Sequence, residues 1–256
     1  MKLITISVSH YVEKVKWALK ISGIPFEEES HLPGIHAAVT LWLTRGAHRS
    51  TPVLIDGNQV IADSTRILRH LATKYRQKWL YPIPQALELE ERFDKNIGPH
   101  TRRFIYEQFF EHGFSVAELY DQKVAIPWQK AILPAFAPLM KEVMIRDMAI
   151  NPAAAEKSRA QFEAEFEFAE KRLADGRMYL CGDTLTAADI TFAALSAPVI
   201  LPQGYGARLP KPEDAPVGSR MRQLIEAYRV RPAGQFILRL YKENRHTPIK
   251  IPAENY

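Results

Sequence analysis

Residues 50–64 read Ser-Thr-Pro-Val-Leu-Ile-Asp-Gly-Asn-Gln-Val-Ile-Ala-Asp-Ser, and this stretch decides the fold. The apolar run Thr51–Ile55 predicts a short strand, and Gln59–Ile61 predicts its antiparallel partner. Between them, Asp56-Gly57-Asn58 is a hairpin signal, because these residue types tolerate the positive φ of tight turns. The pair Asp63-Ser64 then supplies side-chain oxygens that cap a following helix. The stretch therefore predicts a β-hairpin that leads directly into a helix.

The segments before this hairpin alternate between strand and helix patterns. Leu3–Ser7 alternates in polarity and predicts a first strand. Apolar residues then recur at helical spacing from Tyr11 until Gly23 and Pro25 end the helix. A second strand is expected over Phe26–Glu29 and a short helix over Ala37–Leu43. The order β-α-β, crossover, hairpin and closing helix predicts an α/β domain with a small mixed sheet.

The chain beyond this domain predicts helices. Residues 78–86 contain prolines and large aromatics and form a predicted linker, which separates a first domain, residues 1–77, from an all-helical domain, residues 87–256. Thr186 and Asp189 have the spacing of a capping box at a helix start. The stretch Phe104–Met148 is rich in aromatics and poorly periodic.

Composition excludes several classes of protein. The net charge is +5 with a pI near 9.2, but the basic residues are scattered, so no nucleic-acid partner is expected. No apolar run approaches the roughly 20 residues of a membrane span, and the first residues do not resemble a signal peptide. Cys181 is the single cysteine, and no Cys and His spacing indicates a metal site. A cytoplasmic location without a bound metal is expected.

Three separated segments together resemble the glutathione transferase superfamily. They are a turn, residues 9–15 (Ser-His-Tyr-Val-Glu-Lys-Val), the stretch 50–64 quoted above, and the capping segment 182–190 (Gly-Asp-Thr-Leu-Thr-Ala-Ala-Asp-Ile). Residues 232–236 (Pro-Ala-Gly-Gln-Phe) also resemble the bacterial members. The resemblance implies a thioredoxin-like, glutathione-binding N-terminal domain and an all-α C-terminal domain.

The same resemblance implies a serine-type active-site turn. Ser9 stands where the catalytic residue of the family is expected, with Tyr11 as the alternative. A hydroxyl at a helix N-terminus can donate to the thiolate of glutathione, and the helix dipole favours its negative charge. From the residues alone, a plain helix N-cap is the favoured explanation of Ser9, and packing in the first turn that of Tyr11; the resemblance reverses the preference for Ser9.

The resemblance also implies glutathione-binding residues. Thr51 and a cis Pro52 are expected to pair through their backbone with the cysteinyl part of glutathione. Asp63 is expected to meet the γ-glutamyl ammonium group, and Ser64, at a helix N-terminus, its carboxylate. The alternative from the residues alone is a trans proline at a strand start and a plain helix cap.

Two functions follow from these expectations. The first is a detoxifying enzyme that uses glutathione as a substrate and conjugates it to small hydrophobic electrophiles. The second is a non-catalytic glutathione-transferase-like protein that serves binding or interaction. Two features favour it: the family's common proline after the active residue is absent, and the helical segment is long. An affinity for glutathione without turnover would distinguish the second from the first.

The resemblance further implies a homodimer. Light scattering at micromolar concentration is expected to give a mass of about twice the 29.2 kDa of one chain. A monomer mass under these conditions would refute this expectation.

Overall fold

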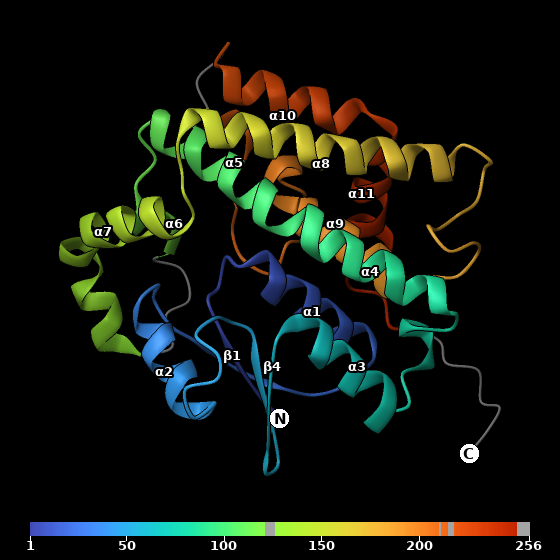
Figure 1. Cartoon of the computed structure of the whole chain (residues 1–256), viewed down its shortest axis with the longest axis horizontal. Coiled ribbons are helices and arrows are strands. Elements are labelled where there is room, and N and C mark those ends of the chain that lie inside the picture. Colours follow the sequence, from blue (N-terminus) through green and yellow to red (C-terminus); the bar gives the residue numbers. More distant parts are fainter. Residues whose placement is uncertain (121–125, 210, 215–217, 250–256) are drawn as a thin grey trace.

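The computed structural model describes residues 1–120, 126–209, 211–214 and 218–249. Its N-terminal part contains a four-stranded sheet in the order β2-β1-β3-β4 (Figure 1). The strands are β1 (Lys2–Thr5), β2 (Glu27–Ser30), β3 (Val53–Asp56) and β4 (Gln59–Ala62). β1 pairs with β2 in parallel and with β3 antiparallel, and β3 and β4 form the hairpin.

Helices cover both faces of this sheet. α1 (His10–Ile21) and α3 (Ser64–Lys74) pack together on one face, where Leu3 and Leu54 join the main hydrophobic core. On the other face, Ile4 and Val53 form a small cluster with residues of α2 (Ile35–Leu43). The alternation of apolar side chains along β1 and β3 thus supplies both faces, as a strand period of two requires.

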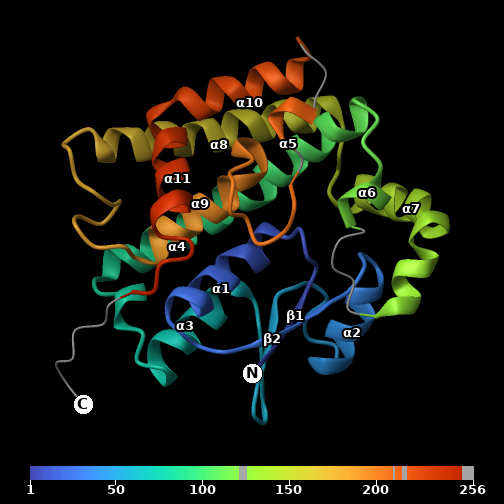
Figure 2. The ribbon, with the colours of Figure 1, turned by 180° about the vertical axis from the view of Figure 1, so that it is seen from behind.

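The rest of the described chain is mainly helical. The helices are α4 (Pro84–Asn96), α5 (Gly98–Glu111), α6 (Val116–Tyr120), α7 (Pro127–Asp147), α8 (Pro152–Leu173), α9 (Ala187–Ile200), α10 (Arg220–Val230) and α11 (Pro232–Glu243), with single 3-10 turns at Lys78–Leu80 and Pro212–Asp214. Among them, α9 lies at the centre and is buried except at Pro198. Its surface contacts α1, α4, α5, α10 and α11, so it joins the helices to the sheet domain (Figure 2).

The predicted fold class is confirmed. Each expected strand and helix of the N-terminal part is present, with ends shifted by one or a few residues. The Thr51–Pro52 peptide bond is cis, as expected. α4 already begins at Pro84, and the division at residues 77 and 87 stays a prediction.

The described residues of the poorly periodic stretch between Phe104 and Met148 form the end of α5 and all of α6 and α7, while residues 121–125 lie outside the described ranges. α7 contains Pro134 and Pro138 and buries only some of its positions. It lies beside α2, to one side of the main helical layer (Figure 1). No helix in the described ranges is long and apolar enough to cross a membrane.

The predicted capping box at the start of α9 is also confirmed. Asp189 is fully buried and accepts hydrogen bonds from the backbone N–H of Thr186 (2.8 Å), its hydroxyl (2.8 Å) and the N–H of Leu180 (2.7 Å). Burial nevertheless raises the pKa of Asp189 to about 6. The carboxyl group therefore ties the central helix to the loop before it.

We expect Asp189→Ala to lower the free energy of unfolding by at least about 3 kcal/mol, because three buried donors lose their acceptor. Urea unfolding monitored by circular dichroism measures this loss. Asp183→Ala is the matched control, since Asp183 lies in the same loop but is exposed. A loss below about 1 kcal/mol in Asp189→Ala would contradict a central role for this cap.

Candidate functional site

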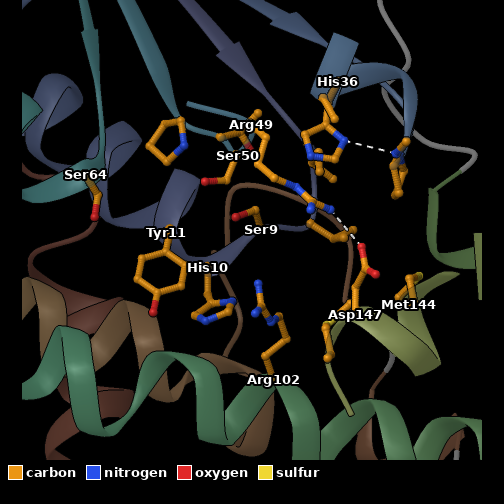
Figure 3. Close-up of a pocket in the computed structure, with 18 of the residues that line it drawn as sticks. Ser9, His10, Tyr11, His36, Arg49, Ser50, Ser64, Arg102, Met144 and Asp147 are labelled. Atoms are coloured by element: carbon orange, nitrogen blue, oxygen red, sulfur yellow. Dashed lines mark hydrogen bonds and ion pairs between the residues drawn. The ribbon is translucent and has the colours of Figure 1, made fainter. Parts of the chain in front are cut away.

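A cavity of about 480 Å³ lies where the N-terminal end of α1 faces the helical part of the chain. One wall comes from the sheet domain and carries Ser9, Thr51, Pro52, Asp63 and Ser64 (Figure 3). The opposite wall comes from α5, α6, α7 and the C-cap of α7, and includes Arg102, Tyr106, Tyr120, Val143, Met144, Asp147 and Met148. The cavity thus brings together all of the predicted site residues of the sheet domain.

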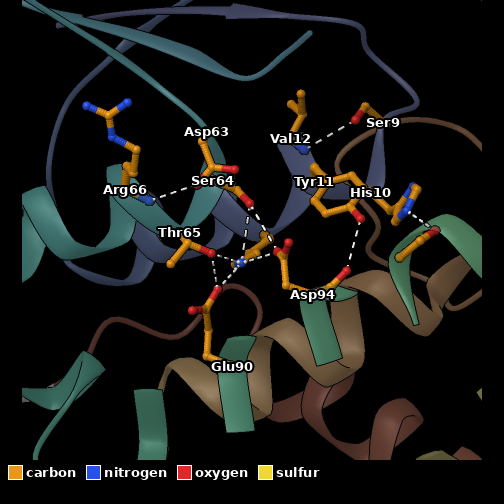
Figure 4. Close-up of polar contacts among 12 residues, drawn as sticks. Ser9, His10, Tyr11, Val12, Asp63, Ser64, Thr65, Arg66, Glu90 and Asp94 are labelled. Atoms are coloured by element: carbon orange, nitrogen blue, oxygen red, sulfur yellow. Dashed lines mark hydrogen bonds and ion pairs between the residues drawn. The ribbon is translucent and has the colours of Figure 1, made fainter. Parts of the chain in front are cut away.

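Ser9 is the N-cap of α1. Its backbone is extended, and its Oγ accepts a hydrogen bond from the N–H of Val12 at 3.4 Å (Figure 4). No residue that the structure describes accepts the proton of the Ser9 hydroxyl in return. The side chain is half-buried at the cavity, so this proton is free to be donated to a ligand.

The hydroxyl of Tyr11 makes its hydrogen bond to α4. It donates to the backbone carbonyl of Asp94 at 3.1 Å. Gly98 makes this position possible, because a Cβ atom there would lie only 2.1 Å from the Tyr11 oxygen, and burial raises the pKa of Tyr11. Tyr11 therefore joins the two parts of the chain, in agreement with its interpretation as a packing residue.

His10 is buried and uncharged. Burial, aided by the nearby charge of Arg102, lowers the pKa of His10 to about 3. His10 Nε2 lies 2.8 Å from the carbonyl oxygen of Gly98 (Figure 4). Because the ring is neutral, this nitrogen carries the proton and donates it, which leaves Nδ1 as an acceptor. His10 is therefore a structural residue at the cavity wall.

The start of α3 forms the second polar corner of the cavity. Asp63 is the N-cap, and its side chain accepts from the N–H of Arg66 at 3.1 Å. Its φ of 82° lies in the region that favours glycine. Such strained backbone is concentrated at functional sites. The second oxygen of the Asp63 carboxylate accepts no hydrogen bond from a described residue, and Asp63 lines the cavity.

The side chain of Ser64 is held by polar contacts with α1 and α4. Its hydroxyl accepts a hydrogen bond from Lys14 Nζ at 3.3 Å and lies 3.4 Å from Asp94 Oδ1. Lys14 is fully buried and also pairs with Asp94 (2.7 Å), Glu90 and Thr65 (Figure 4). Burial opposes the charged form, but the two carboxylates outweigh it and raise the pKa of Lys14. The hydroxyl of Ser64 is thus engaged by Lys14 and Asp94, and Ser64 itself lines the cavity at the start of α3.

Arg49 spans part of the cavity. It comes from the loop before β3, and its Nη2 pairs with Asp147 at the end of α7 at 2.8 Å (Figure 3). His36 lines the same end of the cavity, and burial lowers its pKa to about 4. No group of three or more His, Cys, Asp or Glu side chains suited to a metal ion occurs in the described part of the chain.

Sequence comparison now places this geometry in a family. The model of the glutathione S-transferase N-terminal domain matches residues 3–79, which contain Ser9 and the Thr51 to Ser64 corner. The model of the glutathione S-transferase C-terminal domain matches residues 152–196, which contain the capping box. The chain belongs to the glutathione transferase superfamily.

Individual members of the glutathione transferase superfamily resemble the chain over nearly its whole length. Glutathione S-transferase 3 of Zea mays is 25% identical over 252 residues, which cover 92% of this chain and 91% of the maize protein. The solved glutathione S-transferase of Ceriporiopsis subvermispora is 17% identical with a TM-score of 0.56, and covers 98% of both chains. That of Methylobacterium radiotolerans is also 17% identical, with a TM-score of 0.52, and covers 100% of this chain and 98% of its own. The two solved structures share the fold of this chain.

The sequence did not predict several charged residues of this site. Among them are Arg49, Asp94 and Arg102, which line the cavity, and Lys14, which is buried beneath it. Asp94 and Glu90 are four residues apart on one face of α4, a spacing that indicates a shared face but not its partner. Lys14 falls among buried positions of α1, where a charged residue signals an ion pair. Neither Arg49 nor Arg102 has a local signal.

The neutral state of His10 predicts a pH dependence of stability. Its folded-state pKa of about 3 lies below the ordinary value of 6.5, so the unfolded chain binds more protons between these values. The free energy of unfolding should therefore fall as the pH drops below 6.5, by up to about 1.4 kcal/mol per unit from this residue. Denaturant titrations of His10→Gln from pH 7 to pH 4.5 should show a shallower fall.

His112→Gln is the control for this experiment, because His112 ends α5 away from the cavity. Equal pH dependence in wild type and His10→Gln would show that His10 is not held neutral.

Proposed function

We propose that the protein is a glutathione transferase that conjugates glutathione to small hydrophobic electrophiles. The observation that carries this proposal is the free hydroxyl proton of Ser9 at the N-terminus of α1, on the same cavity as Thr51, Asp63 and Ser64. The solved relatives from Ceriporiopsis subvermispora and Methylobacterium radiotolerans, which are complexes with glutathione and glutathione sulfonate, support glutathione as the ligand.

The chemistry required is activation of a thiol. The free thiol of a cysteinyl residue has a pKa near 8.5, and lowering it by two units requires about 2.7 kcal/mol. The dipole at the N-terminus of α1 contributes about 0.3–1 kcal/mol, and a hydrogen bond from Ser9 to the thiolate contributes about 1.5–3 kcal/mol. The two together account for the required shift.

The rest of the tripeptide is assigned to the sheet domain. The backbone of Thr51 pairs with the cysteinyl part, beside Pro52. The free oxygen of Asp63 accepts from the γ-glutamyl ammonium group, and the N-terminal backbone of α3 at Ser64 binds its carboxylate. Asp94 also lines this corner and adds negative charge near the ammonium group.

The electrophile is assigned to the opposite wall. Tyr106, Tyr120, Val143 and Met144 offer an apolar surface across the cavity from Ser9. Attack by the thiolate forms the new C–S bond, and the leaving group departs with its electron pair. The roles in detoxification, the cytoplasmic location and the homodimer remain predictions from the sequence.

Immobilised glutathione tests the proposal directly. The protein should bind the resin under reducing conditions and elute with free glutathione. Binding combined with no turnover of chlorinated aromatics, isothiocyanates or peroxides would support instead a non-catalytic binding protein, in which Ser9 serves only as a helix cap. Failure to bind would count against both functions.

We expect Ser9→Ala to reduce turnover by about 10- to 100-fold, because one charge-assisted hydrogen bond to the thiolate is lost. The pKa of bound glutathione, followed by thiolate absorbance, should rise in this variant. Its stability should fall by at most about 1 kcal/mol for the lost cap.

Tyr11→Phe is the matched control, since it also removes one hydroxyl but one that faces Asp94. It should leave the pKa of bound glutathione nearly unchanged. If Tyr11→Phe raises this pKa and Ser9→Ala does not, the assignment is reversed.

A further inference from the structure

Arg102 is a cation of the cavity that the proposed chemistry leaves unused. It extends from α5, on the wall opposite Ser9, into the cavity between His10 and Asp147 (Figure 3). Its Nε is buried without a hydrogen-bond partner. Within the described ranges of the chain, no carboxylate forms an ion pair with its guanidinium group. A buried and unpaired charged donor is costly, so such a group points to a missing ligand.

The other basic side chains at the cavity or beneath it have partners within the protein or are neutral, and His48 Nε2 lies 3.1 Å from the hydroxyl oxygen of Ser50. Arg49 is paired with Asp147, and Lys14 is sealed beneath Ser64 by Glu90 and Asp94. His10 and His36 are neutral, because burial lowers the pKa values of both. A positive charge therefore remains on the wall that faces Ser9, and it is carried by Arg102.

The surroundings of Arg102 combine this charge with apolar surface. A smaller recess adjoins the cavity at Val8, His10, Arg102 and Tyr106, and its remaining lining is apolar: Ile105, Phe109, Pro198, Leu201 and Leu209. Apolar walls exclude water and strengthen the attraction between a guanidinium group and an anion.

A second donor lies beside the guanidinium group. The hydroxyls of Tyr106 and Tyr120 are 2.8 Å apart, and both are buried. Burial raises the pKa values of both, so both hydroxyls keep their protons. Only one of the two protons is used in their mutual hydrogen bond, which leaves the other for an anionic oxygen.

We propose that the electrophile bound opposite Ser9 carries a carboxylate, which pairs with the guanidinium group of Arg102 while its apolar body packs along α5 and α7. The planar, forked donors of arginine match a carboxylate in two parallel hydrogen bonds. This proposal rests on the proposed function, because it assumes that glutathione occupies the side of the cavity that carries Ser9, opposite Arg102.

Two isosteric aromatic electrophiles test the proposal. With 4-chloro-3-nitrobenzoate, the thiolate of glutathione forms a bond to C4 and chloride leaves with the electron pair of the C–Cl bond, while the thiol proton passes to solvent. 4-Chloro-3-nitrobenzamide undergoes the same displacement but carries no charge. Because the two differ in intrinsic reactivity, the ratio of variant to wild type is compared for each compound.

Arg102→Gln should lower kcat/KM for the benzoate by about 10- to 100-fold, chiefly through KM, and should change kcat/KM for the benzamide less than about threefold. Arg102→Lys should recover part of the lost kcat/KM for the benzoate, because lysine restores the positive charge but not the forked pair of donors.

Lys95→Gln is the control, since it removes one positive charge from the exposed face of α4. Equal losses for both compounds in Arg102→Gln, with a raised pKa of bound glutathione, would assign Arg102 to the sulfur and overturn the proposal.

Binding without glutathione separates this inference from the proposed function. By calorimetry, the wild type should bind 4-nitrobenzoate at least about tenfold more tightly than 4-nitrobenzamide, and Arg102→Gln should lose the preference. Equal affinities of the wild type for the two compounds would overturn the inference whether or not any variant folds. A carboxylate preference in a protein that binds no glutathione would instead overturn the proposed function alone.

Discussion

The buried charge of Lys14 constrains the arrangement of the whole site. Its ammonium group lies inside the protein and is satisfied by Ser64 and Thr65 of α3 and by Glu90 and Asp94 of α4. A buried charge without partners costs several kcal/mol, so these groups must stay together in the folded state. α1 carries Lys14 five residues after its N-cap Ser9, and α3 begins at Ser64. The same ion cluster therefore fixes the two helix N-termini that form the polar wall of the cavity.

The contacts between α1 and the helical part extend this constraint. Tyr11 donates to Asp94 and His10 donates to Gly98, so the first turn of α1 is attached to the junction between α4 and α5. At the buried side of α1, Glu13 pairs with Arg245 and accepts from the N–H of Gly206. Residues next to Ser9 thus serve structural contacts, while Ser9 itself keeps a free proton at the cavity. This division is the reason why we propose the serine, and not its larger neighbours, as the residue that contacts the sulfur of glutathione.

The sequence predicted those parts of the fold and site that depend on neighbours along the chain. The hairpin at Asp56-Gly57-Asn58, the caps at Ser9 and Asp63 and the box at Asp189 are local patterns, and each is present. The role of Tyr11 required knowledge of Asp94, 83 positions away, and that of Lys14 required Glu90, 76 positions away. Arg102 has no local signal, because its surroundings come from several distant segments. α7 lacked a clear period because it contains two prolines and because apolar residues beside its buried stripe, such as Trp128 and Leu139, are exposed.

A crystal structure of the protein with glutathione tests the central claim most directly, since it locates the sulfur atom. We expect the sulfur to lie within hydrogen-bond distance of Ser9 Oγ, in front of the N-terminus of α1. We also expect the γ-glutamyl group to lie at Asp63 and the start of α3. A sulfur atom bound instead to the hydroxyl of Tyr11, or a glutathione molecule bound outside this cavity, would contradict the account.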